Sequence, residues 1–124
     1  MFVNEDDIRL RIFKLLVASK RMMTLSEIAK KLRIPQQNVS YHLQQLEWSG
    51  LIIREEHKYF CQPIFLDDEV NGFCANRMSE IIEMFSTRGK TLFADVKNDD
   101  ERNEIILNCL HALILLTIMP NEKQ

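Results

Sequence analysis

The sequence has few of the residues that turn a chain. Only three glycines and three prolines occur among 124 residues, which predicts a mostly helical chain with few turns. Its three cysteines are an odd number at wide spacing, so we expect no disulfide framework and a reducing, cytoplasmic location. The first ten residues, MFVNEDDIRL, are acidic and contain no long apolar run, so we expect no signal peptide.

The motifs of common enzyme sites are also missing. We find no glycine-rich phosphate loop, no Ser/His/Asp or Cys/His arrangement that the sequence places together, and no paired carboxylates in an evident pocket. The acidic clusters at 67–69 and 99–101 stand where helices are expected to begin, and a helix dipole favours negative charge there. We therefore expect no catalytic residues, no cofactor and no enzyme activity.

The composition is that of a globular protein, with 46% hydrophobic and 27% charged residues. The net charge of −2 hides an asymmetry between the two halves of the chain. Residues 1–62 carry ten basic and seven acidic side chains, whereas residues 63–124 carry six and eleven. A basic half and an acidic half suggest that one surface meets phosphate and the other does not.

The first predicted helix covers residues 5–19, with Asn4 as its N-cap. It has two apolar stripes on opposite sides, one of Ile8, Ile12 and Leu15 and the other of Leu10, Phe13 and Val17. A helix that is apolar on two sides is usually buried on two sides. The first stripe would serve the core of the protein, and the second needs another partner.

Residues 21–52 have the pattern of two short helices joined by a tight turn. Ser26 can cap a helix that runs to about Leu32, and the three residues RIP form the turn. The next helix covers 36–48 and ends at Gly50. This is the helix-turn-helix arrangement. Residues 51–66 are β-rich with Glu55, Glu56, His57 and Lys58 in the middle, which predicts a hairpin that serves as a wing.

The rest of the chain is predicted to be helical. One helix has apolar residues at helical spacing from Val70 to Phe85, and a break is expected at 86–90 around Gly89. A last helix covers 99–119, capped by Asn98 or a neighbouring acid. Twelve of its residues 105–119 are apolar, a run too short for a membrane span of ~20 residues. We expect this helix in a homodimer interface with the second stripe of the first helix, through Leu10, Phe13, Val17, Leu110, Leu113, Ile114 and Ile118.

The helix at 36–48 has two chemically different faces. Val39, Leu43 and Leu46 form an apolar stripe, and the opposite side is almost entirely amide and hydroxyl. Gln and Asn can form two hydrogen bonds to adenine in the major groove, whereas an ordinary solvated face carries Glu and Lys pairs. We therefore favour base reading over a polar surface without such a role. The predicted DNA-binding residues are Gln36, Gln37, Asn38, Ser40, Tyr41, His42, Gln44 and Gln45, with Lys30, Lys31, Arg33, Arg54 and Lys58.

The stretch SEIAKKL, the stretch VSYHLQQLEWSGLI and the following hairpin together resemble the ArsR-like family of prokaryotic transcriptional regulators. The resemblance covers about 45 residues and implies dimers formed by the first and last helices, and repression of a promoter. The family's metal sites use either a C-x-C motif or acids and histidine on the last helix. No cysteine occurs between Met1 and Phe60 and the last helix has only His111, so we expect no metal site.

These patterns predict a mainly α protein with a small β-hairpin wing, in which residues 1–66 form a winged helix-turn-helix and residues 67–124 a helical dimerisation extension. The predicted function is a homodimeric regulator that binds specific sequences of double-stranded DNA, with no membrane association and an unknown effector. The alternative is a winged helix used for protein contacts in a transcription or DNA-processing assembly, which the acidic second half favours.

Overall fold

The computed structural model describes residues 7–118, except the side chains of Lys90 and of 113–118. The chain forms two compact units, one up to Thr91 and the other from Leu92 on. The predicted division of roles, with DNA binding in residues 1–66 and dimerisation in 67–124, stays a prediction.

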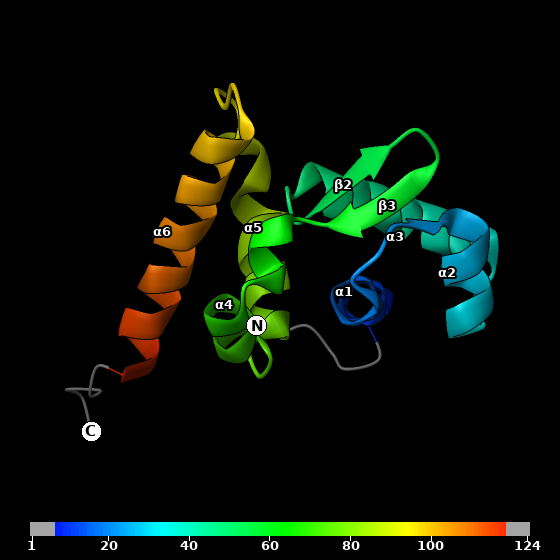
Figure 1. Ribbon diagram of the computed structural model, residues 1–124, viewed down its shortest axis with the longest axis horizontal. Helices are drawn as coiled ribbons and strands as arrows, with labels where there is room; N and C mark the ends of the chain where they lie inside the picture. The colour runs from blue at the N-terminus through cyan, green and yellow to red at the C-terminus, as the bar shows by residue number, and fades with distance from the viewer. Residues whose placement is uncertain (1–6, 119–124) are drawn as a thin grey trace. The chain divides into compact units, whose positions relative to one another are not determined.

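Helices and short strands make up the first part of the first unit, as Figure 1 shows. The helices are α1 (Ile8–Ser19), α2 (Leu25–Leu32) and α3 (Gln36–Trp48). The strands are β1 (Met23–Thr24), β2 (Ile52–Glu55) and β3 (Lys58–Cys61), which form an antiparallel sheet in the order β1-β3-β2. This is a winged helix-turn-helix, as predicted, with one strand, β1, that the sequence pattern did not reveal.

Two helices begin at a different residue from the one predicted. The N-cap of α1 is Asp7, whose carboxylate accepts a hydrogen bond from the backbone N–H of Arg9 at 2.8 Å. The predicted cap, Asn4, lies outside the described residues. The N-cap of α2 is Thr24 rather than Ser26, because Thr24 and Glu27 form a reciprocal capping box.

The position of α3 follows from its apolar stripe. Val39, Leu43 and Leu46 are fully buried, as predicted. The helix starts directly after the predicted turn and ends at Trp48, and Gly50 follows with a φ of 85°. Glycine adopts this left-handed backbone conformation without strain, because it has no Cβ atom. The stripe fixes which side of α3 faces the core and thus which side faces outward.

The second stripe of α1 finds its partner within the same protomer. Phe13 contacts Phe65 edge to face, with ring centroids 5.2 Å apart. Phe65 belongs to the 3-10 helix η1 (Pro63–Leu66), which the sequence pattern did not predict. Leu10 and Val17 are buried as well. We therefore leave these three α1 residues out of the dimer interface proposed below.

The region after the wing contains two helices where one was predicted. Helix α4 (Asp68–Cys74) is capped by Asp67, and α5 (Met78–Leu92) follows after a short turn. The predicted break at 86–90 is wrong, because α5 runs through these residues without interruption. The actual turn, at residues 75–77, contains neither glycine nor proline.

Gly89 is buried within α5 because the helix passes very close to the end of α3. A Cβ atom at this position would lie 2.5 Å from the carbonyl oxygen of Ser49 and 2.7 Å from its Cα. Backbone atoms cannot move aside as a flexible side chain can. Gly89 therefore serves close helix packing and not a turn, which is why its presence misled the sequence-based prediction.

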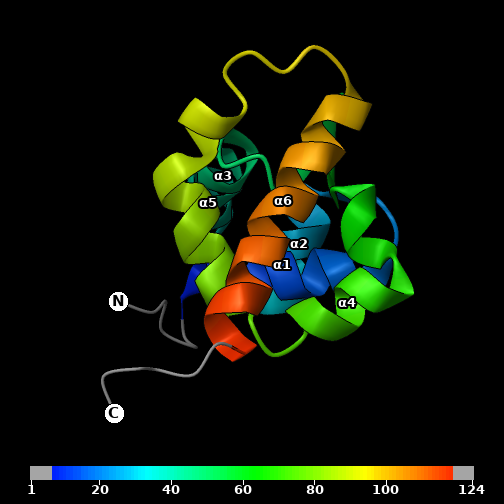
Figure 2. The same ribbon diagram turned by 90° about the vertical axis from the view of Figure 1, so that its left-hand side faces the viewer.

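The second unit contains α6 (Asp99–Ile118), drawn in orange to red as one unbroken helix in Figure 2. The side chain of Asn98 accepts a hydrogen bond from the Glu101 N–H at 2.9 Å, which confirms the predicted cap. Met119, the predicted last residue, lies outside the described part of the chain. Within the described residues, no helix is both long and apolar enough to cross a membrane.

The close approach at Gly89 predicts opposite effects of alanine at two helical glycines. Gly89→Ala places a methyl group against the Ser49 backbone and should lower the free energy of unfolding by about 1–3 kcal/mol. Gly72→Ala in α4 is the matched control, since nothing lies within 4 Å of its added Cβ. It should raise stability by about 0.5–1 kcal/mol through helix propensity. Urea unfolding measures both values, and a Gly89→Ala protein as stable as the wild type would contradict this packing.

Candidate nucleic-acid interface

The outward face of α3 consists of uncharged polar side chains. Six of the eight predicted α3 residues are exposed, and the other two, His42 and Gln45, are half-buried. Tyr41 is the more exposed of the two aromatic side chains of the helix that lie at the surface, Tyr41 and Trp48, with 59% of its surface accessible. The exposed residues are Gln36, Gln37, Asn38, Ser40, Tyr41 and Gln44. Such a face can donate and accept hydrogen bonds without presenting a net charge.

Gln45 connects two members of this face. Its Nε2 donates to the Tyr41 hydroxyl oxygen at 3.2 Å, and its Oε1 lies 3.2 Å from Nδ1 of His42. A carbonyl oxygen only accepts, so in this arrangement Nδ1 of His42 carries a hydrogen and donates it to Gln45. The Tyr41 O–H is left to donate. Gln45 thus sets the hydrogen-bonding pattern that Tyr41 and His42 present.

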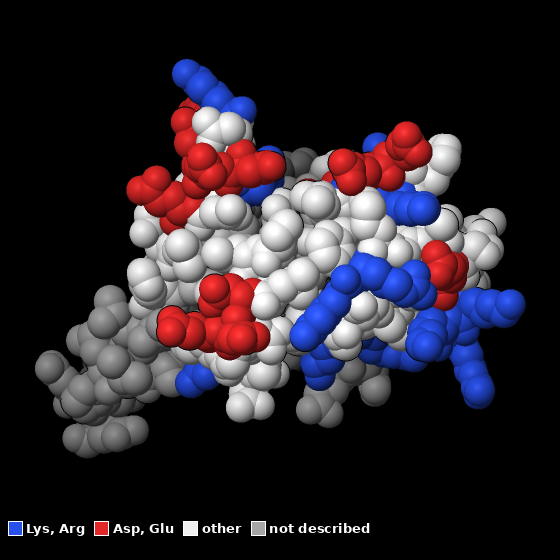
Figure 3. Space-filling model, in the orientation of Figure 1, with Lys and Arg blue, Asp and Glu red and all other residues white. Residues whose placement is uncertain are grey.

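Positive charge lies beside the start of α3. An open hollow of about 610 Å³ is lined in part by Lys30, Arg33, Pro35 and Gln36. Pro35 is the N-cap of α3 and supplies no side-chain hydrogen bond to the first N–H groups of the helix. An uncapped helix start next to two cations suits a phosphate. Lys31 is exposed nearby, and Figure 3 shows Lys and Arg side chains gathered over α1 and α2.

The wing contributes one cation beside α3 and a negatively charged tip. Arg54 lies 3.7 Å from the Glu47 carboxylate, and both line a hollow of about 250 Å³ with Ser40 and Gln44. Lys58 is exposed but stands opposite Glu55 in the sheet register. Exposed acids at the hairpin tip are visible in Figure 3. The structure therefore brings Arg54 next to the α3 face, while Lys58 is offset by an acidic neighbour.

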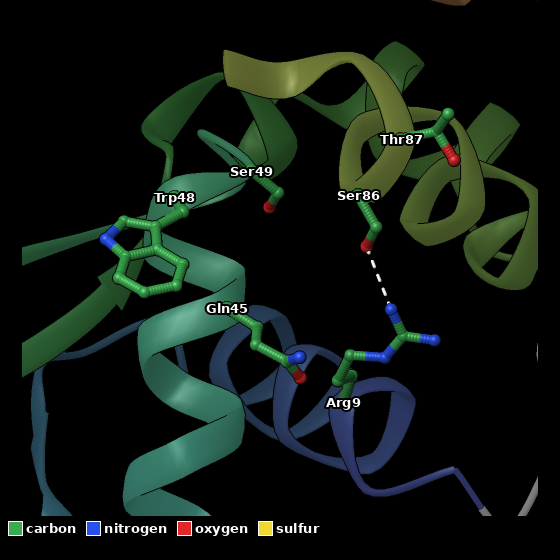
Figure 4. Close-up of a pocket in the computed structure, with 6 residues that line it drawn as sticks. All are labelled: Arg9, Gln45, Trp48, Ser49, Ser86 and Thr87. Atoms are coloured by element: carbon green, nitrogen blue, oxygen red, sulfur yellow. Dashed lines mark hydrogen bonds between the residues drawn. The ribbon is translucent and has the colours of Figure 1, made fainter.

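A second cavity lies on the other side of the α3 end, and sequence reasoning missed it. Arg9 of α1, Gln45, Trp48 and Ser49 at the end of α3, and Ser86 and Thr87 of α5 line about 250 Å³ (Figure 4). Nη1 of Arg9 donates to the Ser86 hydroxyl at 3.0 Å. The two residues are 77 positions apart in the sequence, so no local pattern could have paired them.

Asp7 holds the other edge of the Arg9 side chain. Nε and Nη2 of Arg9 donate to the two carboxylate oxygens at 3.2 and 3.1 Å. Burial alone would raise the pKa of Asp7, but these hydrogen bonds and the nearby positive charge outweigh it and lower the pKa. Asp7 is therefore ionised at neutral pH and keeps Arg9 fixed at the cavity wall.

The cysteines of the first unit are buried. Burial raises the pKa of both Cys61 and Cys74 to about 11, so both remain thiols at neutral pH. Within the described part of the chain, no group of three His, Cys, Asp or Glu side chains is placed to hold a metal ion.

Comparison with known proteins agrees with this geometry. Residues 5–55 match a family model described as a helix-turn-helix domain. This part of the chain is similar to that family and has the helix-turn-helix described above. The match includes α1, both helices of the motif and β2 of the wing. No curated protein and no solved structure matches the chain. The narrower ArsR-like resemblance stays a prediction.

The raised pKa values predict slow thiol chemistry at Cys61 and Cys74 in the first unit. At pH 8, roughly one thiol in a thousand would be ionised at a pKa of about 11. Cys61 and Cys74 should therefore resist iodoacetamide in the native protein and react readily after unfolding in urea. Peptide mass spectrometry after labelling measures each site. Rapid native labelling of Cys61 would show that it is not buried as described.

Proposed function

We propose that this protein regulates transcription as a homodimer that binds specific sequences of double-stranded DNA. The observation that carries the proposal is the geometry of α3: one side is held in the core by three buried residues, and the other presents uncharged amides and hydroxyls. In a helix-turn-helix domain the second helix of the motif enters the major groove. There, amide and hydroxyl groups can distinguish base edges, which lysines on phosphate cannot.

Base reading and affinity are assigned to different residues. Gln37, Tyr41 and Gln44 lie on the exposed face of α3 and would read bases. Lys30, Lys31 and Arg33 lie next to the helix start and would contact phosphates, with Arg54 as a contact from the wing. Three or four phosphate contacts per chain give weak, salt-dependent binding. Two copies bound to one duplex would double the number of phosphate contacts and so bind more tightly, which favours a dimer.

The proposed dimer contact is the apolar last part of α6. Of the α6 residues predicted for this interface, Leu110 is buried within the protomer and is left out, as the α1 residues are. The proposed contact residues are Leu113, Ile114 and Ile118, whose side chains lie outside those that the structure describes. The segment is apolar on every side, with leucine or isoleucine at six of the eight positions from 110 to 118 other than His111. A helix of this composition is stable in water only when most of its surface is covered.

A second candidate function is protein binding by the winged helix. The specific observation in its favour is the wing, whose tip is acidic and whose Arg54 is paired with Glu47. The two cations of this wing, Arg54 and Lys58, are balanced by Glu55 and Glu56, so the wing attracts the DNA backbone little. A gel-shift assay with genomic fragments at low and moderate salt separates the two functions, and no retention at low salt would favour protein binding.

Two sets of alanine substitutions should affect DNA binding in different ways. Replacing Gln37, Tyr41 and Gln44 should abolish preference for a selected duplex over a random one, with non-specific binding retained. Replacing Lys30, Lys31 and Arg33 should weaken binding to all duplexes, and the slope of log affinity against log salt should fall by up to about 2.7 per chain. Fluorescence anisotropy at several salt concentrations measures both effects. If the first variant keeps its preference, α3 does not read bases.

The proposed dimer predicts a change of mass when charge is placed on α6. The wild type should sediment as a dimer at micromolar concentration, and Leu113→Lys with Ile118→Lys should sediment as a monomer. The double variant should bind an inverted repeat at least tenfold more weakly, because one protomer then provides half the contacts. Asn108→Lys, at an exposed position of the same helix, is the control. A wild-type monomer would contradict the dimer.

A further inference from the structure

The cavity between α1, α3 and α5 is rich in hydrogen-bond donors. All six lining residues belong to the first unit, so the cavity is contained within one compact body. In Figure 4 the side chains of Arg9 and Gln45 point toward one another from two helices, and Arg9 reaches on to Ser86 of the third. The volume of about 250 Å³ is slightly below the range of drug-sized ligand sites.

The hydrogen bonds at its wall leave donors unused. A guanidinium has five N–H groups, and contacts among the described residues use three of them, two to Asp7 and one to Ser86. The Ser86 oxygen accepts from Arg9, so its own hydrogen is left to donate. One hydrogen of the Gln45 amide nitrogen also remains after its bond to Tyr41. These donors come from three helices and surround a single space.

We propose that this cavity binds a small carboxylic acid whose presence changes how α3 meets DNA. The carboxylate accepts hydrogen bonds from Arg9 and from the Gln45 amide, and Trp48 at the end of α3 borders the cavity while its indole turns away from these donors (Figure 4). Because Asp7 already neutralises much of the Arg9 charge, a singly charged acid fits better than a dianion such as phosphate.

Gln45 is the link between the cavity and the reading face. The same amide that lines the cavity holds Tyr41 and lies next to Nδ1 of His42. A ligand that accepts the remaining hydrogen of the Gln45 amide pulls on the same group that holds Tyr41 and lies next to His42, so it shifts the positions of both side chains. The affinity for DNA then changes by at most the factor by which the ligand binds the shifted arrangement of Gln45, Tyr41 and His42 more tightly than the present one. This coupling rests on the proposed function, whereas binding in the cavity does not.

Benzoate is a suitable probe, and Trp48 is a built-in reporter because it is the only tryptophan in the sequence. Titration of benzoate into the full chain should change Trp48 fluorescence in a saturable way and shift the NMR signals of the Gln45 side-chain amide. Benzamide has the same shape without the charge and should bind more weakly. Inorganic phosphate should produce no saturable change. No saturable response to benzoate, equal binding of benzamide, or binding of phosphate alone would each overturn the assignment.

Variants at the cavity wall test where the probe binds. Arg9→Gln should weaken benzoate binding tenfold or more, because it removes a charged donor. Ser86→Phe should also abolish binding by filling the cavity from α5, and it leaves the Asp7–Arg9 pair in place although it removes the hydrogen bond from Arg9 to Ser86. Arg11→Gln is the matched control, since this guanidinium on the same helix is exposed and donates to the carbonyl of Leu32 instead. Unchanged binding in both cavity variants would overturn the proposed site, and circular dichroism verifies that each variant is folded.

The coupling is measured by DNA binding with and without benzoate. Saturating benzoate should change the affinity of the wild type and of Arg11→Gln by about fivefold or more, and should leave that of Arg9→Gln unchanged. If benzoate binds but does not change the affinity for a duplex that the protein binds, the proposed coupling through Gln45 is wrong. If the protein binds no DNA at all while benzoate still binds, the proposed function fails and the cavity assignment stands.

Discussion

The burial of Val39, Leu43 and Leu46 is the constraint on which the candidate interface depends. All three side chains are fully buried, so α3 cannot rotate about its axis without exposing one of them to water. Burying a side chain of this size contributes about 1.5–3 kcal/mol. The rotation of the helix is thereby fixed, and with it the direction of Gln37, Tyr41 and Gln44. A packing requirement in the core thus determines which side chains a bound duplex would meet.

The end of α3 is held by a different kind of contact. Gly50 allows the chain to leave the helix toward the wing, and Gly89 allows α5 to pass against the Ser49 backbone. Together these glycines place the wing on one side of Trp48 and α5 on the other. A hollow on each side includes Trp48, which has 54% of its surface exposed. The reading helix therefore ends between the wing and a donor-rich cavity, where a ligand could influence it.

Much of this arrangement could be predicted from the sequence, because local patterns encode it. The bounds of α3 follow from Pro35, the apolar stripe and Gly50, and the cap of α6 follows from Asn98. The first turn of α2 could also have been predicted, since Thr24 and Glu27 have the spacing of a capping box. The structure differs where contacts between distant residues decide the outcome. In the sequence, Gly89 resembles a helix breaker, and only the folded structure shows that it packs against Ser49. In the same way, the sequence does not reveal that Phe65 of η1 is the partner of Phe13. Arg9 and Ser86 meet only in the folded chain.

The central claim is that the amide and hydroxyl face of α3 reads base edges. An NMR titration of the full chain with a duplex that it selects from random sequences tests this most directly. The account predicts that the largest changes occur in the side chains of Gln37, Tyr41 and Gln44, while those of the buried stripe change little. It also predicts that a random duplex perturbs Lys30, Lys31 and Arg33 without these α3 changes. If the selected duplex leaves the α3 face unperturbed, or if no duplex is selected, the claim is contradicted.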